Sequence, residues 1–359
     1  MRITFVLGKL DFSGGVISTI ELANRLFQKG HEVTIVHPSI IIGPRFKWYN
    51  FRSVFSNLSK IKKTEQILSK RISIESKMLN VPTLNEKNIP DADAIIATWW
   101  ETAYYVSNYP ISKGIKFYFV RAYEVWYGSK TLVDKTYSLP LHIITTSNYL
   151  KTHLKRGFEV DALELVPNGV DFDLFYRTHP PSYCGKPKRV GMVYRQPKWK
   201  GMQDGFQAFQ IAKNHYPDLQ LVLFGSPLGN DVPRDVEFHE YPPIAELRDL
   251  YNSLDVFMLT SHSGEGFAKP PMEAMACGVP CVLTNVGAVP DYTVAGKTAL
   301  VSPPNDPEAL AKNLLTLVTD DLKRKDIAEA GHNHIKGYSW DKSASKLEAL
   351  LKQWVHHSD

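Results

Sequence analysis

Short, fully apolar segments alternate with amphipathic segments along most of this chain, and this alternation limits its fold more than any other feature. A strand that is apolar on both faces must be covered on both sides, so it belongs in a parallel sheet with helices against each face. In the first half, such strands are expected at 3–7, 33–36, 94–97, 116–120 and 142–146. Apolar residues at helical spacing over 16–29 separate the first two, and Gly30 then supplies a left-handed helix stop. The sequence therefore predicts an α/β domain.

Turn-rich sequence interrupts this alternation near residue 170, and the stretch 177–188 holds three prolines and a glycine. The alternation then restarts. Strands are expected at 189–194, 219–224, 256–259 and 280–283, with helices over 204–215, 244–254 and 271–277 and from Asp306 onward. A length of 359 residues fits two domains of roughly 100–200 residues each. We expect a first domain at 1–170, a linker at 171–188, a second domain at 189–338, and a C-terminal helix within 339–359 that packs back on the first domain.

Several classes of protein are disfavoured. The composition, 43% hydrophobic and 22% charged, is that of a globular chain and not of a disordered or coiled-coil one. No apolar run approaches the roughly 20 residues of a membrane-spanning helix. The apolar N-terminal stretch is short and soon meets Asp11, which predicts a buried strand and not a secretory signal. Cys184, Cys277 and Cys281 form no CxxC pair. We therefore expect reduced thiols and a cytoplasmic location.

Basic charge is concentrated in the first half of the chain. Residues 1–170 carry a net charge of +8 and residues 171–359 a net charge of −3. Within 45–77, nine basic residues meet only Glu65 and Glu75, and large aromatic side chains lie between them. This mixture fits either peripheral contact with an anionic membrane at the inner face or a solvated helix with some core aromatics. Nucleic acid is not an expected partner, because no binding motif accompanies the patch.

The strongest chemical motif is the string SGEGFAKPPMEAMACGVP at 263–280. Glu265 lies in a loop flanked by glycines, and Glu273 lies eight residues later in the first turn of a short expected helix. Free backbone N–H groups and a helix start suit phosphate, while a carboxylate accepts hydrogen bonds from vicinal hydroxyls such as those of a ribose. The alternative is two capping acids on a surface helix.

Two cations, Arg195 and Lys200, follow the first expected strand of the second domain. The guanidinium offers a planar fork of donors and the ammonium a compact charge, and both suit a phosphate group. Positive groups aimed at charge that develops on a leaving group are usually the largest catalytic contribution. With these cations present, no metal ion is required for that purpose, and no metal or other cofactor is expected.

The string at 263–280 resembles the E-x7-E motif of the retaining glycosyltransferases of the GT-B fold, the family 4 type (glycosyl transferases group 1). Further blocks at 13–15, 30–33, 167–171, 193–201 and 285–291 are similar to that family and follow its order. The resemblance implies two Rossmann-like domains that face each other across a cleft. It also implies transfer of a sugar, with retention of configuration, from a nucleoside-diphosphate sugar to a glycan or lipid-linked acceptor. The base (UDP, GDP or dTDP) stays open.

The resemblance also implies roles for individual residues. Arg195 and Lys200 would hold the diphosphate, and Glu273 would bind the ribose hydroxyls. Glu265 would lie along the transferred sugar, so that Arg195, Lys200 and Glu265 are the candidate catalytic residues. The remaining candidates for donor binding are the backbone groups of Gly266, Phe267 and Ala268, together with Gly14 and Gly15, which allow a close approach of the first loop.

The sequence departs from the family where many members place a histidine after a strand of the first domain. The comparable stretch at 117–126 contains none, and Arg121, Tyr123 and Glu124 are candidates for that space. Glu124 either binds an acceptor hydroxyl or pairs with Arg121.

Three further candidates on the acceptor side, Trp99, Trp100 and Glu101, follow another strand. The two rings form either a platform for a sugar or part of the core. Asp91 and Asp93 have the DxD form of metal-dependent glycosyltransferases of another fold, but acids before a buried strand are ordinary. We expect them to be structural.

Two other functions fit the same architecture. A nucleotide-sugar epimerase or hydrolase would act on the donor without an acceptor. A two-domain solute-binding protein would bind without catalysis, although it would normally need a secretory signal. A dehydrogenase is disfavoured because no GxGxxG follows the first strand.

Overall fold

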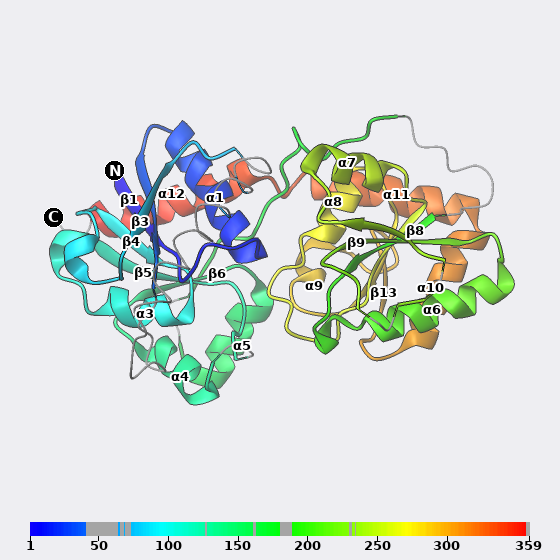
Figure 1. Ribbon diagram of the computed structural model, residues 1–359, viewed down its shortest axis with the longest axis horizontal. Coiled ribbons are helices and arrows are strands. Elements are labelled where there is room, and N and C mark those ends of the chain that lie inside the picture. The colour runs from blue at the N-terminus through cyan, green and yellow to red at the C-terminus, as the bar shows by residue number, and fades with distance from the viewer. Residues whose placement is uncertain are drawn as a thin grey trace. The chain divides into compact units, whose positions relative to one another are not determined.

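The computed structural model describes residues 1–40, 64, 68, 73–125, 128–160, 163–179, 189–229, 232–233 and 235–356. The chain forms two compact units, each of which is a sheet covered by helices (Figure 1). The first unit consists of Met1–Gly169 and Trp340–Asp359, and the second of Val170–Ser339.

The first unit contains a seven-stranded sheet in the order β3-β2-β1-β4-β5-β6-β7, and every pairing in it is parallel. Its strands are β1 Arg2–Val6, β2 Glu32–Pro38, β3 Lys77–Val81, β4 Ala94–Ala97, β5 Ile115–Val120, β6 His142–Thr145 and β7 Leu163–Leu165. Its helices are α1 Gly14–Gln28, α3 Trp100–Ser107, α4 Lys130–Lys135, α5 Asn148–Phe158 and α12 Trp340–His356, with 3-10 turns η1 Glu86–Asn88, η2 Ile111–Lys113 and η3 Thr136–Ser138.

The strand order of the first unit reverses direction at the β1–β4 pair. The loops that follow β1, β4 and β5 therefore leave the sheet at neighbouring carboxyl ends, where open α/β sheets bind their ligands. Ser13 begins α1 as its N-cap, with its Oγ accepting a hydrogen bond from Val16 N. The two glycines of the first loop are thus the first two residues of a helix.

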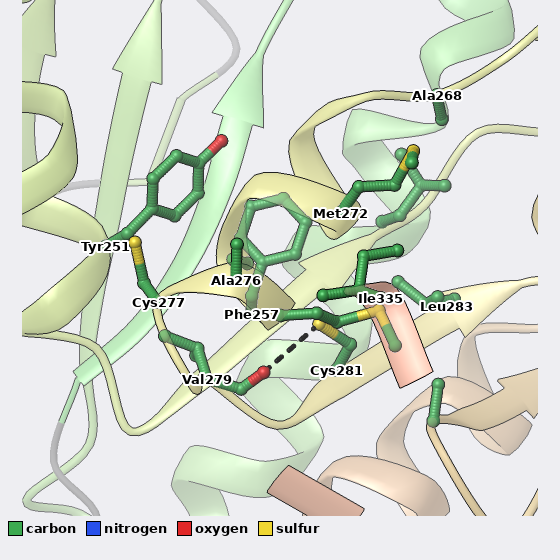
Figure 2. Packing of buried hydrophobic residues seen from close by; sticks show 14 of the residues in the cluster. Tyr251, Phe257, Ala268, Met272, Ala276, Cys277, Val279, Cys281, Leu283 and Ile335 are labelled. Atoms are coloured by element: carbon green, nitrogen blue, oxygen red, sulfur yellow. Dashed lines mark hydrogen bonds between the residues drawn. The ribbon is translucent and has the colours of Figure 1, made fainter. Parts of the chain in front are cut away.

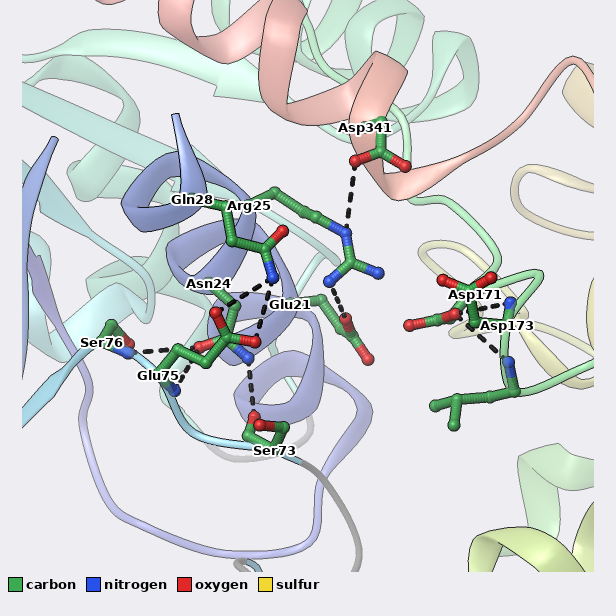
Figure 3. A network of polar contacts seen from close by, with 11 residues as sticks. Glu21, Asn24, Arg25, Gln28, Ser73, Glu75, Ser76, Asp171, Asp173 and Asp341 are labelled. Atoms are coloured by element: carbon green, nitrogen blue, oxygen red, sulfur yellow. Dashed lines mark hydrogen bonds and ion pairs between the residues drawn. The ribbon is translucent and has the colours of Figure 1, made fainter. Parts of the chain in front are cut away.

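The C-terminal helix α12 packs on α1 in the first unit, as predicted. Its apolar face joins the same buried cluster as Val16 and Ile20. Figure 3 shows a polar contact that reinforces this packing, with Arg25 Nε 3.4 Å from Asp341 Oδ1 of α12. It also shows Asn24 of α1 bonded to the backbone of Ser73 and Glu75, which ties α1 to the segment before β3.

The second unit contains a six-stranded sheet in the order β10-β9-β8-β11-β12-β13, also with parallel pairings throughout. Its strands are β8 Arg189–Tyr194, β9 Gln220–Gly225, β10 Glu237–Glu240, β11 Val256–Leu259, β12 Cys281–Thr284 and β13 Leu300–Ser302. Its helices are α6 Met202–His215, α7 Ile244–Asn252, α8 Pro270–Ala276, α9 Val289–Tyr292, α10 Pro307–Thr319 and α11 Asp321–Ile335, with the 3-10 turn η4 Lys198–Lys200.

Helix α8 is anchored by apolar packing. Figure 2 shows Met272 and Ala276 of α8 among the buried side chains of Phe257 and Leu283 from the sheet. Cys277 and Cys281 lie in the same cluster as free thiols, and burial raises the pKa of Cys277 to about 12. This core fixes the helix that carries Glu273.

The boundary between the units differs in detail from the expected linker at 171–188. The first unit ends at Gly169. The expected linker begins inside the second unit, because the apolar side chain of Phe175 is buried in the core of that unit. Val170 N donates to Tyr338 O at 2.9 Å, so the two passages of the chain between units lie side by side. Residues 180–188 lie outside the described residues.

Candidate functional site

Arg195 directly follows β8 and lies against the end of β9. Its Cζ is 5.7 Å from the centre of the Tyr241 ring, and its Nη1 is buried without a hydrogen-bond partner. Gly225 has φ +141°, and a Cβ there would approach Nη1 to 3.0 Å and crowd the carbonyl of Tyr194. A glycine is therefore needed beside the guanidinium. The site holds a buried donor that no protein group satisfies.

Lys200 ends a 3-10 turn whose backbone is tied to the segment after β11. Thr260 Oγ1 donates to Lys200 O at 3.0 Å, and His262 N donates to Trp199 O at 2.8 Å. Gly201 has φ +62°, and a Cβ on it would collide with the carbonyl oxygen of Thr260. The turn and the β11 segment are packed so closely that only glycine fits between them.

The side chain of Lys200 is paired with Glu265. Lys200 Nζ lies 2.5 Å from Glu265 Oε1, and the same oxygen accepts a hydrogen bond from Ser261 Oγ at 2.7 Å. Glu265 is only 8% exposed, and Nζ lies 4.2 Å from the centre of the Trp199 ring. The ion pair is thus largely removed from water, which strengthens it and makes each partner depend on the other.

Glu273 on α8 has its own buried partner. The Tyr251 hydroxyl donates to Glu273 Oε2 at 2.9 Å, and Tyr251 is fully buried. Burial raises the pKa of Glu273, while Lys269 and Tyr251 oppose that rise. In the described part of the chain, the other carboxylate oxygen of Glu273 accepts no hydrogen bond. The tyrosine fixes the carboxyl group in one orientation.

Buried side chains hold the backbone between Glu265 and Glu273 in place. Phe267 and Ala268 are buried, and the Phe267 ring lies 5.5 Å from that of Tyr292. Gly266 is buried with them. The side chains of Phe267 and Ala268 therefore anchor the loop. The structure joins Lys200 directly to Glu265, whereas Arg195 and Glu273 contact other groups, the two tyrosines named above.

In the first unit, the loop after β5 contacts the first residues of helices α1 and α3. Arg121 Nη1 donates to Gly15 O, and Trp100 N donates to Glu124 Oε2 at 3.0 Å. Arg121 is 8% and Glu124 5% exposed. Among the described residues no salt bridge joins Arg121 to Glu124, although the two side chains attract each other electrostatically. Burial raises the pKa of Glu124 to about 8 and lowers that of Arg121 to about 10.

The other acceptor-side candidates differ in exposure. The Trp100 ring is fully buried and meets Tyr104 edge-on, so it belongs to the core and is not a platform for a sugar. Trp99 and Glu101 are partly exposed. The Tyr123 hydroxyl donates to Asp134 Oδ1 at 2.8 Å, which fixes that ring in the loop.

Asp91 and Asp93 have basic partners in the structure. Asp91 lies 2.8 Å from Lys113 Nζ, and Asp93 lies 2.9 Å from Arg2 Nη2. No cluster of three or more candidate metal ligands is found within the described ranges. The basic aromatic region at 45–77 lies outside the described residues except for 64, 68 and 73–77.

A groove of about 600 Å³ lies elsewhere in the second unit, beside α6. Phe206, Phe209, Lys213 and Val236 are among its lining residues, and none of the predicted site residues is. It plays no part in the site described here.

Three residues of the site carry no signal in the sequence. Ser261, Tyr251 and Tyr241 contact Glu265, Glu273 and Arg195, respectively, and each belongs to a different loop or helix. Tyr251 and Tyr241 are brought to the motif residues by the packing of the unit, whereas Ser261 lies only four residues before Glu265.

Comparison with known proteins links the second unit to a family. Residues 182–334 match the family model described as Glycosyl transferases group 1. The D-inositol 3-phosphate glycosyltransferase of Corynebacterium urealyticum is 30% identical over 182 residues, or 46% of this chain and 43% of the relative. The O-antigen chain mannosyltransferase B of Escherichia coli is 27% identical over 242 residues, or 61% and 62%. The chain thus spans about half the length of the curated relatives it matches.

The fold is shared over nearly the whole chain. The crystal structure of Anabaena Alr3699/HepE in complex with UDP-glucose has a TM-score of 0.76 at 16% identity, and the match covers 98% of this chain and 100% of that one. The expected GT-B fold class is confirmed by this likeness, which at such identity concerns the fold alone.

Proposed function

We propose that the chain is a retaining glycosyltransferase of the glycosyl transferases group 1 family, whose model matches residues 182–334. It transfers a sugar from a nucleoside-diphosphate sugar to a glycan or lipid-linked acceptor. Cationic side chains, without a metal ion, stabilise the leaving diphosphate. The observation that carries the proposal is that the ion pair of Lys200 with the buried Glu265, and the partly buried Arg195 with an unsatisfied N–H group, follow the carboxyl ends of β8 and β11.

In this proposal, the two cations stabilise the leaving diphosphate. As the bond between sugar and phosphate breaks, negative charge grows on the diphosphate, and preorganised donors that lower its energy accelerate the reaction. Arg195 has a buried N–H group with no protein partner, which an oxyanion would satisfy. Lys200 supplies a second charge from a turn with little freedom to move.

In this proposal, the two carboxyl groups bind the ribose and the transferred sugar of the donor. Glu273, oriented by Tyr251, accepts hydrogen bonds from the ribose hydroxyls. Glu265 lies along the transferred sugar and exchanges its contact with Lys200 for one with the substrate. Gly14 and Gly15 in the first unit allow a close approach to the phosphates or acceptor.

The relatives support the substrate class without naming the substrate. One relative is named for D-inositol 3-phosphate, another as an O-antigen chain mannosyltransferase, and a third for a monoacylated phosphatidylinositol monomannoside. A structure of the same fold holds UDP-glucose. These names fit a nucleotide-sugar donor and acceptors that are glycans or lipid-linked.

Nucleotide binding tests the donor site. We expect one of UDP, GDP and dTDP to raise the unfolding temperature by several degrees, equally with magnesium and with EDTA. Arg195→Gln and Lys200→Gln should each lower that nucleotide's affinity about tenfold or more, whereas Arg189→Gln, at a surface ion pair with Glu237, should not. A response that requires magnesium would contradict the metal-independent part of the proposal.

Product analysis separates transfer from the alternatives. With donor and an acceptor panel, NMR should show an anomeric configuration matching that of the donor. Release or rearrangement of the sugar without acceptor would favour an epimerase or hydrolase. Binding without any turnover would favour a solute-binding protein.

Membrane contact is a separate part of the proposal. In the described part of the chain, no helix has the length and apolar character needed to cross a membrane. We infer peripheral contact through the basic aromatic region at 45–77, from its composition alone. Flotation with anionic and neutral vesicles tests this, and equal absence from both lipid fractions would refute it.

A further inference from the structure

The guanidinium of Arg121 is buried and mostly unpaired. Its Nη1 donates to Gly15 O, but Nε and Nη2 are buried without any hydrogen-bond partner. These two N–H groups form the side edge of the guanidinium, the edge that binds two adjacent oxygens of a carboxylate or phosphate. A buried, charged donor pair without a partner is costly for the fold, so its persistence needs an explanation beyond stability.

The positive charge of Arg121 is only weakly compensated by its surroundings. Glu124 is the buried carboxyl group nearest in sequence and attracts the guanidinium, but no salt bridge joins the two in the described part of the chain, and its Oε2 accepts from the N–H of Trp100. With a pKa raised to about 8, Glu124 is largely protonated at neutral pH. Asp11, near the same helix start, is paired with Lys9 at 2.9 Å. The face of the Phe119 ring lies 4.9 Å from Arg121 Cζ, which does not neutralise the charge.

The start of helix α1 lies against the same guanidinium. A Cβ on Gly15 would lie 4.0 Å from Cδ and Nη1 of Arg121, and a Cβ on Gly14 would meet nothing within 4 Å. Within the described residues, the N–H groups of Gly14 and Gly15 make no hydrogen bond, and α1 is 15 residues long. The unpaired N–H groups at the positive end of a long helix therefore lie beside the guanidinium of Arg121, at the sheet position where α/β domains bind ligands.

We propose that Arg121, with the first backbone N–H groups of α1, forms an oxyanion-binding site within the first unit. Its ligand is a phosphate or carboxylate group of a substrate. That this group belongs to a substrate rests on the proposed glycosyltransferase function, whereas the anion site itself does not. The group is either the diphosphate of the donor or an acidic group of the acceptor, and the experiments below separate these two sources.

Inorganic phosphate tests the site directly in the full chain. The background is Arg195→Gln/Lys200→Gln, which removes the two cations of the second unit. We expect phosphate, compared with chloride at equal ionic strength, to raise the unfolding temperature of this background. Adding Arg121→Gln should abolish the shift, and Arg121→Lys, which keeps the charge but loses the two-pronged edge, should leave part of it. The matched control is Arg2→Gln, which removes one charge from the same unit at an exposed ion pair and should leave the shift intact.

Arg121→Gln also distinguishes a ligand-binding role from a structural one. Removing an unpaired buried charge should leave the unfolding temperature of the ligand-free protein unchanged or higher, while phosphate binding is lost. A phosphate response equal in the Arg121→Gln and Arg2→Gln proteins would overturn the proposal. Loss of folding in Arg121→Gln, with a full phosphate response in Arg121→Lys, would also overturn it, because the charge and not the two-pronged edge would then suffice.

The source of the anion is identified with Arg195 and Lys200 intact. If Arg121→Gln weakens a nucleoside diphosphate about tenfold and the matching monophosphate less than twofold, the donor supplies the group. If neither nucleotide is affected and the KM for an acidic acceptor rises while that for its neutral analogue does not, the acceptor supplies it. A positive phosphate result in a protein that binds no nucleotide would refute the proposed function and leave the anion site standing.

Discussion

Lys200 and Glu265 form a buried ion pair, with Nζ 2.5 Å from Oε1, so the cation assigned to the diphosphate is held by the carboxylate assigned to the sugar. A bound diphosphate must therefore compete with Glu265 for Lys200. Binding of the donor would therefore displace the Glu265 carboxylate from Lys200.

Glu265→Gln is expected to separate binding from turnover. Loss of the buried partner should lower the unfolding temperature of the free protein, because it leaves Lys200 uncompensated. The nucleoside diphosphate should bind about threefold or more tightly, since its competitor is gone, while kcat falls about a hundredfold. Calorimetric titration and steady-state kinetics measure both. Glu237→Gln, which breaks the surface pair with Arg189, is the control. Weaker nucleotide binding at unchanged kcat would contradict the exchange.

Tyr251→Phe tests the support of Glu273. Without the hydroxyl that donates to Oε2, the carboxyl group loses its fixed orientation, and affinity for a nucleoside diphosphate should fall about five- to tenfold. Affinity for pyrophosphate, which has no ribose, should stay the same. Tyr292→Phe is the matched control, since the Tyr292 hydroxyl is buried without a partner and its removal should be neutral or stabilising. Equal losses for both ligands would refute a ribose-specific role.

Gly201→Ala should disrupt the turn that carries Lys200. The backbone there has φ +62°, and the added Cβ would also collide with Thr260 O. Gly296→Ala is the control, because Gly296 has φ +74° but open space around it. We expect a loss of about 1–2 kcal/mol in the free energy of unfolding for Gly296→Ala, from backbone conformation alone. Gly201→Ala should lose more stability and most nucleotide affinity. Denaturant titration would contradict this if the two losses were equal.

The buried carboxyl group of Glu124 predicts a pH-dependent stability. Its pKa is raised from 4.5 to about 8 by burial and by Glu101, against opposing effects of Trp100 N and Arg121. Since the folded state favours the protonated form, the cost of ionising it is absent at pH 4.5 and below and grows to its full value above pH 8. Glu124→Gln, which keeps an acceptor for Trp100 N, should be near neutral at pH 5 and raise the unfolding temperature by about 5 °C or more at pH 8.5.

The control for this pH effect is Glu164→Gln, at an exposed carboxylate in β7 of the same unit. Its effect on the unfolding temperature should vary little between pH 5 and pH 8.5. Parallel pH profiles for the two variants would show that Glu124 is ionised in the folded protein throughout this range.

The central strands of both sheets could be predicted from the sequence, whereas the strands towards the edges could not. β4 and β11 match the expected apolar segments, because strands buried on both faces must be apolar throughout. β3, β7, β10 and β13 were missed, and all four lie at the ends of their sheets. β3, β7 and β10 carry exposed or half-exposed polar residues, so they contain no apolar run, and β13 is only three residues long.

The candidate site was predictable only where one short segment carries it. Glu265 and Glu273 share a segment, and Arg195 and Lys200 share a loop, so their spacing is visible in the sequence. The partners that orient them come from elsewhere: Tyr251 lies 22 residues before Glu273, and Arg121 lies 106 residues after Gly15. Such pairings arise from the packing of elements and leave no local pattern.

Helix α12 belongs to the first unit although the whole second unit precedes it in the chain. During synthesis, the ribosome therefore releases the complete second unit before the last helix of the first. Until then the apolar face of α1 that α12 covers stays exposed, and it is a ready target for chaperones. The core of the first unit therefore cannot be completed until the whole second unit has been synthesised.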